Sequence, residues 1–535
     1  MIGEKKIRNL IRGFAQSAER FAERPALVVD RERLSYGQLS CKAQSIALAI
    51  LKTEEDPYPL AALLAYRSVT AYAGVLGILA SGKGYVPLNP KFPIERTRTM
   101  LLLAGCSTLV VGTECLRELP ALLARVDRRL LVVLPEVAEP MSLPANFPNH
   151  RFVFADEIPS ANGLVYPTAV DSGAVAYLMF TSGSTGVPKG VPIYHRNVRP
   201  YVECICDRYE VTAEDRFSQQ FDQTFDLSVH DMFVAWERGA CLFSVPERSV
   251  MAPAKFIREQ QLTMWFSVPS VIGLLSRMRL LSPNCFPSLR CSLFCGEPLL
   301  ATQAQLWQQA APHSIVENLY GPTETTIAIS HYRWDADGSP RECVNGIVPI
   351  GWSFAGQSAC VIGDDRQAVA AGNSGELCLA GSQVTTGYWN NPEKTCEQFV
   401  RLAGMGERLW YRTGDLVQQD ERGCLHYIGR TDQQIKIRGY RAELQEIEAV
   451  LRKVCGTEEA VSVPLPSSNG STEGVAAFVS GTAELDSDRI LSSCRQLLPD
   501  YMVPWKIYSV KELPLNANGK VDRSQLAERL KGIPE

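Results

Sequence analysis

A chain of 535 residues is too long for one hydrophobic core, so its length predicts at least two domains. A net charge of −4 without a block of basic residues argues against a nucleic-acid partner. No apolar run reaches the roughly 18 residues that a membrane span needs, and the polar N-terminus does not resemble a signal peptide. The 16 cysteines include no CxxC pair and stand mostly in apolar contexts. We therefore expect a reduced, cytoplasmic protein without nucleic-acid or membrane partners.

The first half of the chain alternates predicted strands and helices. Ser35 occupies an N-cap position before a helical apolar pattern. Further along, 61–65 is predicted as a strand, 69–81 as a helix that ends at Gly82, and 84–88 as the next strand. Strand-helix-strand order predicts a parallel α/β sheet. Similar apolar runs recur at 108–111, 129–133, 264–267 and 291–294.

The pattern changes after about residue 350. Short apolar runs with Gly and Asn turns stand at 358–362, 375–380 and 423–428. They predict an antiparallel β subdomain over about 345–430. A compact α+β unit follows Arg430.

A loop rich in glycine and hydroxyl groups, Thr181-Ser-Gly-Ser-Thr-Gly-Val-Pro-Lys-Gly190, follows a predicted buried strand at 174–180. Glycines let backbone N–H groups turn toward an anion, the hydroxyls add donors, and Lys189 adds a charge. The loop is not a Walker A motif, which requires Gly at Pro188 and Ser or Thr at Gly190. It predicts a polyphosphate site, with a plain surface turn as the alternative.

Three other stretches fit nucleotide chemistry. Asn318-Leu-Tyr-Gly-Pro-Thr-Glu324 offers an aromatic ring that can stack on a purine and an acid suited to Mg²⁺. Tyr411-Arg-Thr-Gly-Asp415 places an acid after a predicted tight turn, where it can accept hydrogen bonds from ribose hydroxyls. Lys520 stands on a glycine turn, from which a point charge can reach a distant site. Each stretch alone also fits an ordinary turn or cap.

Together these stretches resemble the core motifs of the adenylate-forming superfamily. Five further stretches resemble other core motifs of the superfamily: 34–39, 84–90, 225–228, 375–389 and 429–448. All of the motifs occur along the chain in the order that the family shows. The resemblance covers nearly the whole chain. Within the superfamily the chain resembles stand-alone amino acid adenylation enzymes of nonribosomal peptide synthesis, both prolyl-adenylating enzymes and D-alanine–carrier protein ligases.

The resemblance implies an α/β fold with a large N-terminal domain over residues 1–430 and a small mobile α+β C-terminal domain over 431–535, hinged at Asp432. It also implies two half-reactions. In the first, an amino acid carboxylate attacks the α-phosphorus of ATP with Mg²⁺ present. In the second, the phosphopantetheine thiol of a carrier protein takes the aminoacyl group. Two reactions at one site explain the need for a hinge.

The resemblance also assigns roles to single residues. Lys520 would bridge the substrate carboxylate and phosphate, and Glu324 would bind Mg²⁺. Thr181, Ser182 and Lys189 would handle the β- and γ-phosphates. Tyr320 would stack on adenine, Asp415 would hold the ribose and Arg430 would contact ribose or phosphate. The full implied nucleotide-binding set is Thr181, Ser182, Gly183, Ser184, Thr185, Gly186, Lys189, Glu297, Asn318, Leu319, Tyr320, Gly321, Thr323, Asp415, Arg430 and Lys520.

Asp226 would pair with the α-amino group of the substrate, which selects amino acids over plain carboxylic acids. The implied pocket is mostly apolar, and His230 is either a polar contact or, as we favour, a neutral packed residue. This pocket predicts a small apolar amino acid as the substrate, with L-proline as the first expectation and L- or D-alanine as the alternative. The remaining pocket residues are Leu227, Ser267, Leu293, Cys295, Leu319, Ile327 and Ala328.

Two other classes of protein are disfavoured. An acyl- or aryl-CoA ligase of the same fold would not need Asp226. A non-catalytic binding protein would not need Lys189, Glu324, Asp415 and Lys520 together. Because no carrier segment follows Arg523, we expect an enzyme that acts on a carrier protein in trans.

Overall fold

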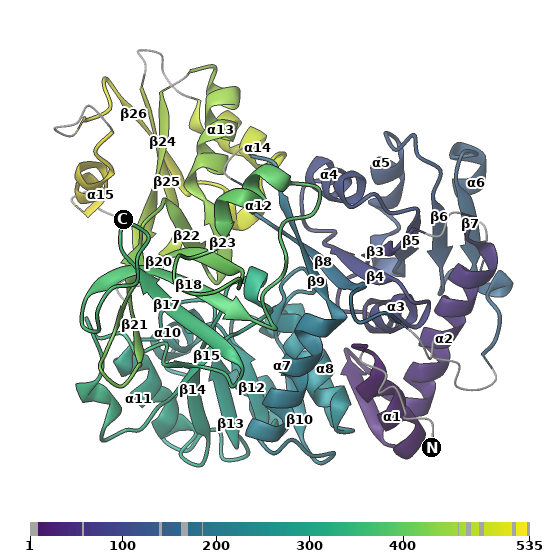
Figure 1. The fold of residues 1–535 in the computed structure, drawn as a ribbon. Coiled ribbons are helices and arrows are strands. Elements are labelled where there is room, and N and C mark those ends of the chain that lie inside the picture. The colour runs from purple at the N-terminus through teal and green to yellow at the C-terminus, as the bar shows by residue number, and fades with distance from the viewer. Residues whose placement is uncertain are drawn as a thin grey trace.

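The computed structural model describes residues 9–55, 58–138, 142–161, 170–183, 186–457, 459–466, 472–480, 486–515 and 521–531. Figure 1 shows two large sheets with helices packed against them, a smaller antiparallel sheet, and a C-terminal unit with a sheet of its own. The expected α/β fold class is confirmed. None of the described helices is both long and apolar enough to span a membrane.

A seven-stranded sheet of order β7-β6-β5-β3-β4-β8-β9 is parallel except where β9 runs antiparallel to β8. Its first connection, α3 (Val69–Ala80), is buried along its whole length, which explains its apolar sequence. The strands are β3 (Leu60–Leu64), β4 (Gly84–Leu88), β5 (Thr108–Val111), β6 (Leu131–Leu134), β7 (Arg151–Phe154), β8 (Val175–Thr181) and β9 (Lys189–Tyr194), with helices α4 (Ile94–Ala104), α5 (Leu119–Leu123) and α6 (Leu143–Asn146).

A nine-stranded sheet has the order β16-β15-β14-β13-β12-β10-β11-β1-β2, with a parallel centre and antiparallel ends. Its strands are β1 (Pro25–Val29), β2 (Glu32–Ser35), β10 (Arg216–Gln219), β11 (Cys241–Ser244), β12 (Met264–Ser267), β13 (Cys291–Phe294), β14 (Ile315–Tyr320), β15 (Ser330–Arg333) and β16 (Trp352–Ser353). Its helices are α7 (His195–Arg208), α8 (Leu227–Glu237), α9 (Ala254–Glu259), α10 (Ser270–Arg277) and α11 (Ala301–Ala310).

Near the N-terminus, α1 (Arg12–Arg20) and α2 (Tyr36–Thr53) contribute buried residues to the hydrophobic core of the two large sheets. The Ser35 side chain accepts the N–H of Gln38, and the Gln38 side chain accepts the N–H of Ser35 in return. This capping box fixes the start of α2 where the sequence predicted it. A single hydrophobic cluster joins both large sheets through α3, α7 and α8. The two sheets therefore form one body.

The predicted antiparallel β subdomain is a five-stranded sheet of order β17-β18-β20-β19, with β21 paired to β20. One prediction was wrong here, because Asp415 lies inside β20 and not after a tight turn. Gly414 adopts φ 72°, and the register of β18 and β20 shifts beside it. This bulge re-aims the Asp415 side chain without ending the strand. The elements are β17 (Gln357–Ile362), β18 (Ser374–Gly381), α12 (Pro392–Gln398), β19 (Phe399–Val400), β20 (Trp410–Gln419) and β21 (Leu425–Arg430).

The C-terminal unit has its own hydrophobic core around Ile437, Leu451 and Val475. Its sheet has the order β23-β22-β25-β24, with β26 beside β25. The hairpin β22–β23 faces the rest of the molecule, and α13 follows it directly. The elements are β22 (Gln434–Ile437), β23 (Tyr440–Glu443), α13 (Leu444–Cys455), β24 (Ala460–Pro466), β25 (Thr472–Ser480), α14 (Ser487–Arg495), β26 (Lys506–Val510) and α15 (Arg523–Lys531).

A buried ion pair ties α7 to α8 at the centre of the molecule. The Arg199 guanidinium donates to both oxygens of Glu237, at 2.5 and 2.6 Å, and their side chains are 5% and 7% exposed. Arg199→Ala leaves the Glu237 carboxylate buried without this partner. We expect it to lower the free energy of unfolding by about 3–5 kcal/mol, measured by chemical denaturation. Arg401→Ala removes the exposed Arg401–Glu407 pair and should change stability little. Equal losses in both variants would contradict this account.

Candidate active site

Adjoining cavities lie where the C-terminal unit meets the rest of the chain. The inner cavity encloses about 370 Å³, and its lining includes Glu297, Asn318, Leu319 and Tyr427. The central cavity shares residues with it and is also lined by Thr181, Ser182, Asp226, Leu227, Cys295, Gly321 and Thr323. The outer cavity, of about 530 Å³, shares Phe92, Phe225, Tyr440 and Tyr501 with the central one. Residues that are far apart in sequence thus line adjoining cavities.

Asp415 is at the junction of the inner and central cavities. The Tyr320 hydroxyl donates to one oxygen of its carboxylate, and the Arg430 guanidinium donates to the other. Arg430 stands opposite Asp415 in the β20–β21 register and also donates two hydrogen bonds to Asp432, at 2.7 Å each. The structure therefore brings together the expected stacking ring, the ribose acid, the basic residue and the hinge aspartate.

Glu297 and Asn318 border the inner cavity through fixed side chains. The Glu297 carboxylate accepts the Ser270 N–H at 2.8 Å, while burial raises the pKa of this carboxyl. The Asn318 amide donates to the carbonyls of Val348 and Pro349, at 3.2 and 2.9 Å. These bonds hold the walls of the cavity in place.

Glu324 is fully buried, and although its neighbour Thr323 lines the central cavity, Glu324 itself does not. Nη1 of Arg441, on β23, donates to both of its oxygens, at 3.0 and 2.9 Å. The Tyr388 hydroxyl adds a third bond at 2.8 Å. Burial opposes ionisation, but Arg441 and Lys189 outweigh it and hold the pKa of Glu324 below its usual value. The carboxylate is therefore charged and has a cation beside it.

The Thr181–Gly190 loop joins two antiparallel strands, with Thr181 directly opposite Lys189. Lys189 is the first residue of β9, and burial with the nearby Arg441 lowers its pKa to about 8. Within the described part of the chain, the Thr181 hydroxyl is buried without a hydrogen-bond partner, whereas Ser182 donates to the Arg441 carbonyl at 3.0 Å. Gly183 and Gly186 hold the turn through one backbone bond of 3.0 Å. Ser184 and Thr185 lie outside the described residues.

Asp226 stands at the N-terminus of α8, 7% exposed. Burial raises the pKa of its carboxyl to about 7, although hydrogen bonds from the Ile327 N–H and the Thr323 hydroxyl oppose this. Ile327 donates at 3.3 Å from a left-handed conformation of φ 70°. A β-branched residue rarely adopts that conformation, so the surrounding structure must impose it.

Only part of the expected substrate pocket borders the central cavity. Leu227 and Cys295 line it beside Asp226. The other expected wall residues are buried but do not line it among the residues described: His230, Ser267, Leu293, Leu319, Ile327 and Ala328. His230 bonds to the Tyr201 hydroxyl at 2.8 Å, and burial lowers its pKa to about 3. It is therefore neutral and packed.

Sequence reasoning missed several residues of the site. Arg441, Tyr440 and Lys436 all belong to the 429–448 motif, yet no role was assigned to them. Tyr440 packs against both Phe225 and Tyr501, with ring centroids at 5.2 and 4.3 Å. Conversely, Lys520 lies outside the described residues. Its described neighbours Leu515 and Val521 pair with each other and do not line the central cavity.

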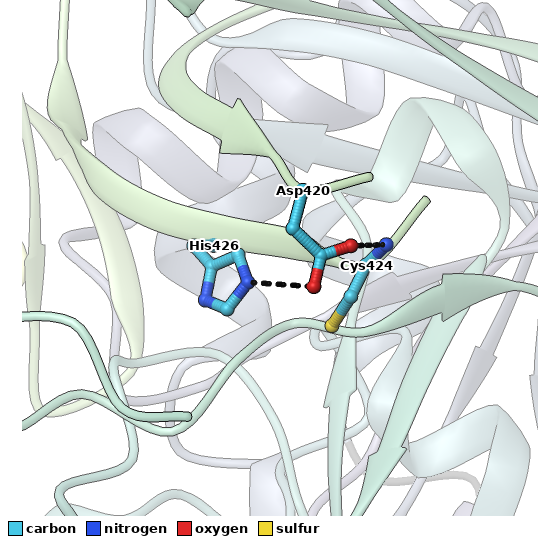
Figure 2. A group of neighbouring side chains, drawn as sticks. All are labelled: Asp420, Cys424 and His426. Carbon is cyan, nitrogen blue, oxygen red and sulfur yellow. Dashed lines mark hydrogen bonds and ion pairs between the residues drawn. The ribbon is translucent and has the colours of Figure 1, made fainter. Parts of the chain in front are cut away.

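A second group of polar side chains lies at the far end of the β20–β21 hairpin. Figure 2 shows Asp420, Cys424 and His426, which each place a ligand-type atom within 4.8 Å of the others. One Asp420 oxygen accepts the Cys424 N–H at 2.8 Å, and the other pairs with the Arg422 guanidinium at 3.1 Å. Burial raises the pKa of the Cys424 thiol to about 12. Because the carboxylate already has a cation and the thiol is neutral, we assign no metal to this group.

Comparison with known proteins gives matches along most of the chain. The profile of the AMP-binding enzyme family matches residues 14–389, and that of the AMP-binding enzyme C-terminal domain matches residues 446–520. The chain is 34% identical to tyrocidine synthase 3 of Brevibacillus parabrevis and 32% identical to surfactin synthase subunit 2 of Bacillus subtilis (strain 168). These alignments cover 96% of this chain but only 7% and 13% of those relatives.

Solved structures extend the comparison to the fold. The Vibrio cholerae adenylation domain AlmE, in complex with glycyl-adenosine-5'-phosphate, superposes with a TM-score of 0.90 at 33% identity, over 100% of this chain and 99% of that one. PA1221, described as containing adenylation and PCP domains, has a TM-score of 0.77 at 24% identity, over 97% of this chain and 84% of that one. The second likeness bears on the fold alone.

Proposed function

The chain belongs to the AMP-binding enzyme family, and from this premise we propose that it activates a small α-amino acid with ATP. A carboxylate oxygen of the amino acid attacks the α-phosphorus of ATP. The bond from that phosphorus to the bridging oxygen breaks, so aminoacyl-AMP forms and pyrophosphate leaves. Such a displacement depends on positioning and charge more than on covalent catalysis by the protein.

The inner cavity supports a nucleoside site. Tyr320 offers an aromatic face, and the Asp415 carboxylate beside it can accept hydrogen bonds from ribose hydroxyls. Arg430 brings positive charge to the same place. Thr181 and Ser182 line the central cavity where the phosphates would lie, and Lys189 is directly opposite Thr181 in the pairing of β8 with β9. Glu324 fits Mg²⁺, because its carboxylate is charged, buried and already arranged to hold a cation.

The observation that carries the proposal is the environment of Asp226. Among the described residues no cationic side chain forms an ion pair with this carboxylate, which is 7% exposed and borders the cavity. A buried acid without a cation is costly to ionise, as its pKa of about 7 reflects. The ammonium group of an amino acid would supply the missing charge. This feature favours amino acids over the fatty and aryl acids of CoA ligases.

The cavity walls support a substrate of the size of glycine or alanine. Beyond Asp226, Leu227 and Cys295, the expected pocket residues are packed behind the wall and leave no side-chain compartment in the central cavity. AlmE, whose structure holds glycyl-adenosine-5'-phosphate, is consistent with this size. L-Proline and alanine of either hand remain predictions from the sequence.

The outer cavity supports a second reaction with a carrier thiol. Its lining includes the exposed Met251, and it shares Phe225 and Tyr440 with the central cavity. A phosphopantetheine arm entering there would reach the aminoacyl-AMP. Its thiol sulfur would attack the acyl carbon, and AMP would leave with the electrons of the acyl–phosphate bond.

Amino-acid-dependent exchange of labelled pyrophosphate into ATP tests the substrate. We expect the strongest exchange with glycine and alanine, weaker exchange with proline, and none with fatty or aryl acids. Each amino acid, including D-alanine, is assayed at equal concentration. Exchange driven only by a large side chain would contradict the pocket argument, and exchange with acids that lack an amino group would favour the CoA ligase alternative.

The pKa of Asp226 predicts the pH dependence of substrate binding. Because the carboxyl of the free site protonates below about pH 7, its neutral form cannot pair with the ammonium group. The apparent affinity for the amino acid should therefore fall about tenfold per pH unit below pH 7 and level off above it. Asp226→Asn should bind the amino acid weakly at every pH. A wild-type profile that is flat between pH 5 and 7 would rule out this role.

Lys520→Ala tests the expected catalytic lysine. We expect adenylate formation to be lost while amino acid binding, measured by calorimetry, is largely retained, because the lysine would act on the reacting phosphate. Lys511→Ala, at a nearby lysine in the C-terminal unit, is the matched control and should keep full exchange. Normal exchange in Lys520→Ala would remove this residue from the mechanism.

A further inference from the structure

Glu324 and Arg441 belong to the two parts of the chain that Asp432 joins. Glu324 follows β14 in the large body, whereas Arg441 is on β23 of the C-terminal unit. Their side chains are 0% and 17% exposed, and the guanidinium donates to both carboxylate oxygens. The pair is therefore a buried contact between units, at the residue that we propose as the Mg²⁺ ligand.

We infer that Arg441 replaces the divalent cation at Glu324 after the first reaction, so that the β22–β23 hairpin and magnesium pyrophosphate exclude each other. The inference rests on the proposed function, because it takes Glu324 as the metal ligand. It makes Arg441 a positioning residue, which acts through Glu324 and the placement of the hairpin. The order of the two reactions would then be enforced at this one carboxylate.

Electrostatics supports the exclusion. One carboxylate balances one positive charge well, but Lys189 already lies near this pair and its pKa is lowered to about 8, by burial first and then by Arg441. A divalent cation placed on Glu324 with Arg441 still present would add strong repulsion in a buried site. Either the guanidinium or the metal can therefore occupy this place.

A hydrogen bond from the expected phosphate loop also supports the exclusion of magnesium pyrophosphate by the hairpin. The Ser182 hydroxyl, on the expected phosphate loop, donates to the backbone carbonyl of Arg441 at 3.0 Å. A hydroxyl has one proton to donate, so the same group cannot also donate to a phosphate oxygen. The hairpin thus takes up Ser182, a donor that the nucleotide phosphates would use, and Glu324, the carboxylate that their Mg²⁺ would use.

Two other ion pairs between the units do not involve residues expected to bind the nucleotide or the metal. Arg96 pairs with Glu446 in a buried contact, and Arg277 pairs with Glu473 in a more exposed one. Neither pair includes an expected nucleotide or metal residue. Both pairs stabilise the docked C-terminal unit, and because the Arg277–Glu473 pair is partly exposed its loss should change docking little, which makes Arg277 a suitable control position.

Calorimetric titration of the full chain with pyrophosphate in Mg²⁺ buffer tests the inference. Wild type must give up the Arg441 contact to bind, whereas Arg441→Ala need not. The variant should therefore bind magnesium pyrophosphate roughly 5- to 150-fold more tightly, the range typical of coupled sites. Arg277→Ala should match wild type, and Glu324→Gln should bind poorly. With EDTA replacing Mg²⁺, the advantage of Arg441→Ala should disappear.

Hydrogen exchange of the segment 440–443 gives a readout that does not depend on activity. In wild type, magnesium pyrophosphate should speed exchange there, because the hairpin leaves the site. In Arg441→Ala, exchange should be fast with or without the ligand. Arg441→Lys keeps the charge but loses the planar guanidinium whose Nη1 donates to both oxygens of Glu324, so an intermediate result is expected, and it serves if the alanine variant folds poorly.

Two outcomes would overturn the inference. Only the second of them would also contradict the proposed function. If wild type and Arg441→Ala bind magnesium pyrophosphate equally and hairpin exchange does not respond, the exclusion is wrong while the proposed function stands. If no variant binds magnesium pyrophosphate and no amino acid drives exchange into ATP, the proposed function fails as well.

Discussion

A fully buried carboxylate needs a cation beside it, and the structure depends on how Glu324 obtains one. Its partner Arg441 is 117 residues away in sequence and belongs to the other unit. The site is consequently complete only when the C-terminal unit is docked. A hinge that separates the units would leave this charge in need of a different cation, so the requirement connects local electrostatics to the arrangement of the domains.

The other acids of the site differ in whether a cation lies beside the carboxylate. Asp415 pairs with Arg430 across neighbouring strands, so its partner comes from the same sheet. Among the described residues Asp226 forms no ion pair; burial raises the pKa of its carboxyl, and the hydrogen bonds from Ile327 and Thr323 oppose this. Glu297 is likewise buried without an ion pair among the described residues, and burial raises its pKa as well. Of these two acids, Asp226 is the one that we propose to pair with the charge of the substrate.

Much of the fold could be predicted because local patterns specify it. The N-cap at Ser35, the apolar run of α3 and the short strands of the antiparallel sheet all depend on neighbouring residues, and each was found where it was expected. Asp415 was misplaced because a bulge depends on the register with β18, which lies elsewhere in the sequence. The position of Lys189 on a strand likewise depends on its pairing with Thr181.

The sequence by itself determined which chemical groups the proposed site contains: the loop of hydroxyls, Tyr320, Glu324, Asp415 and Asp226, which we propose as the amino-group anchor. It could do so because these groups stand in short motifs whose order along the chain is distinctive. Only the tertiary structure decided which groups touch. It placed His230 behind the pocket wall and Arg441 on Glu324, because burial and the docking of two units depend on contacts between distant segments that no local pattern records.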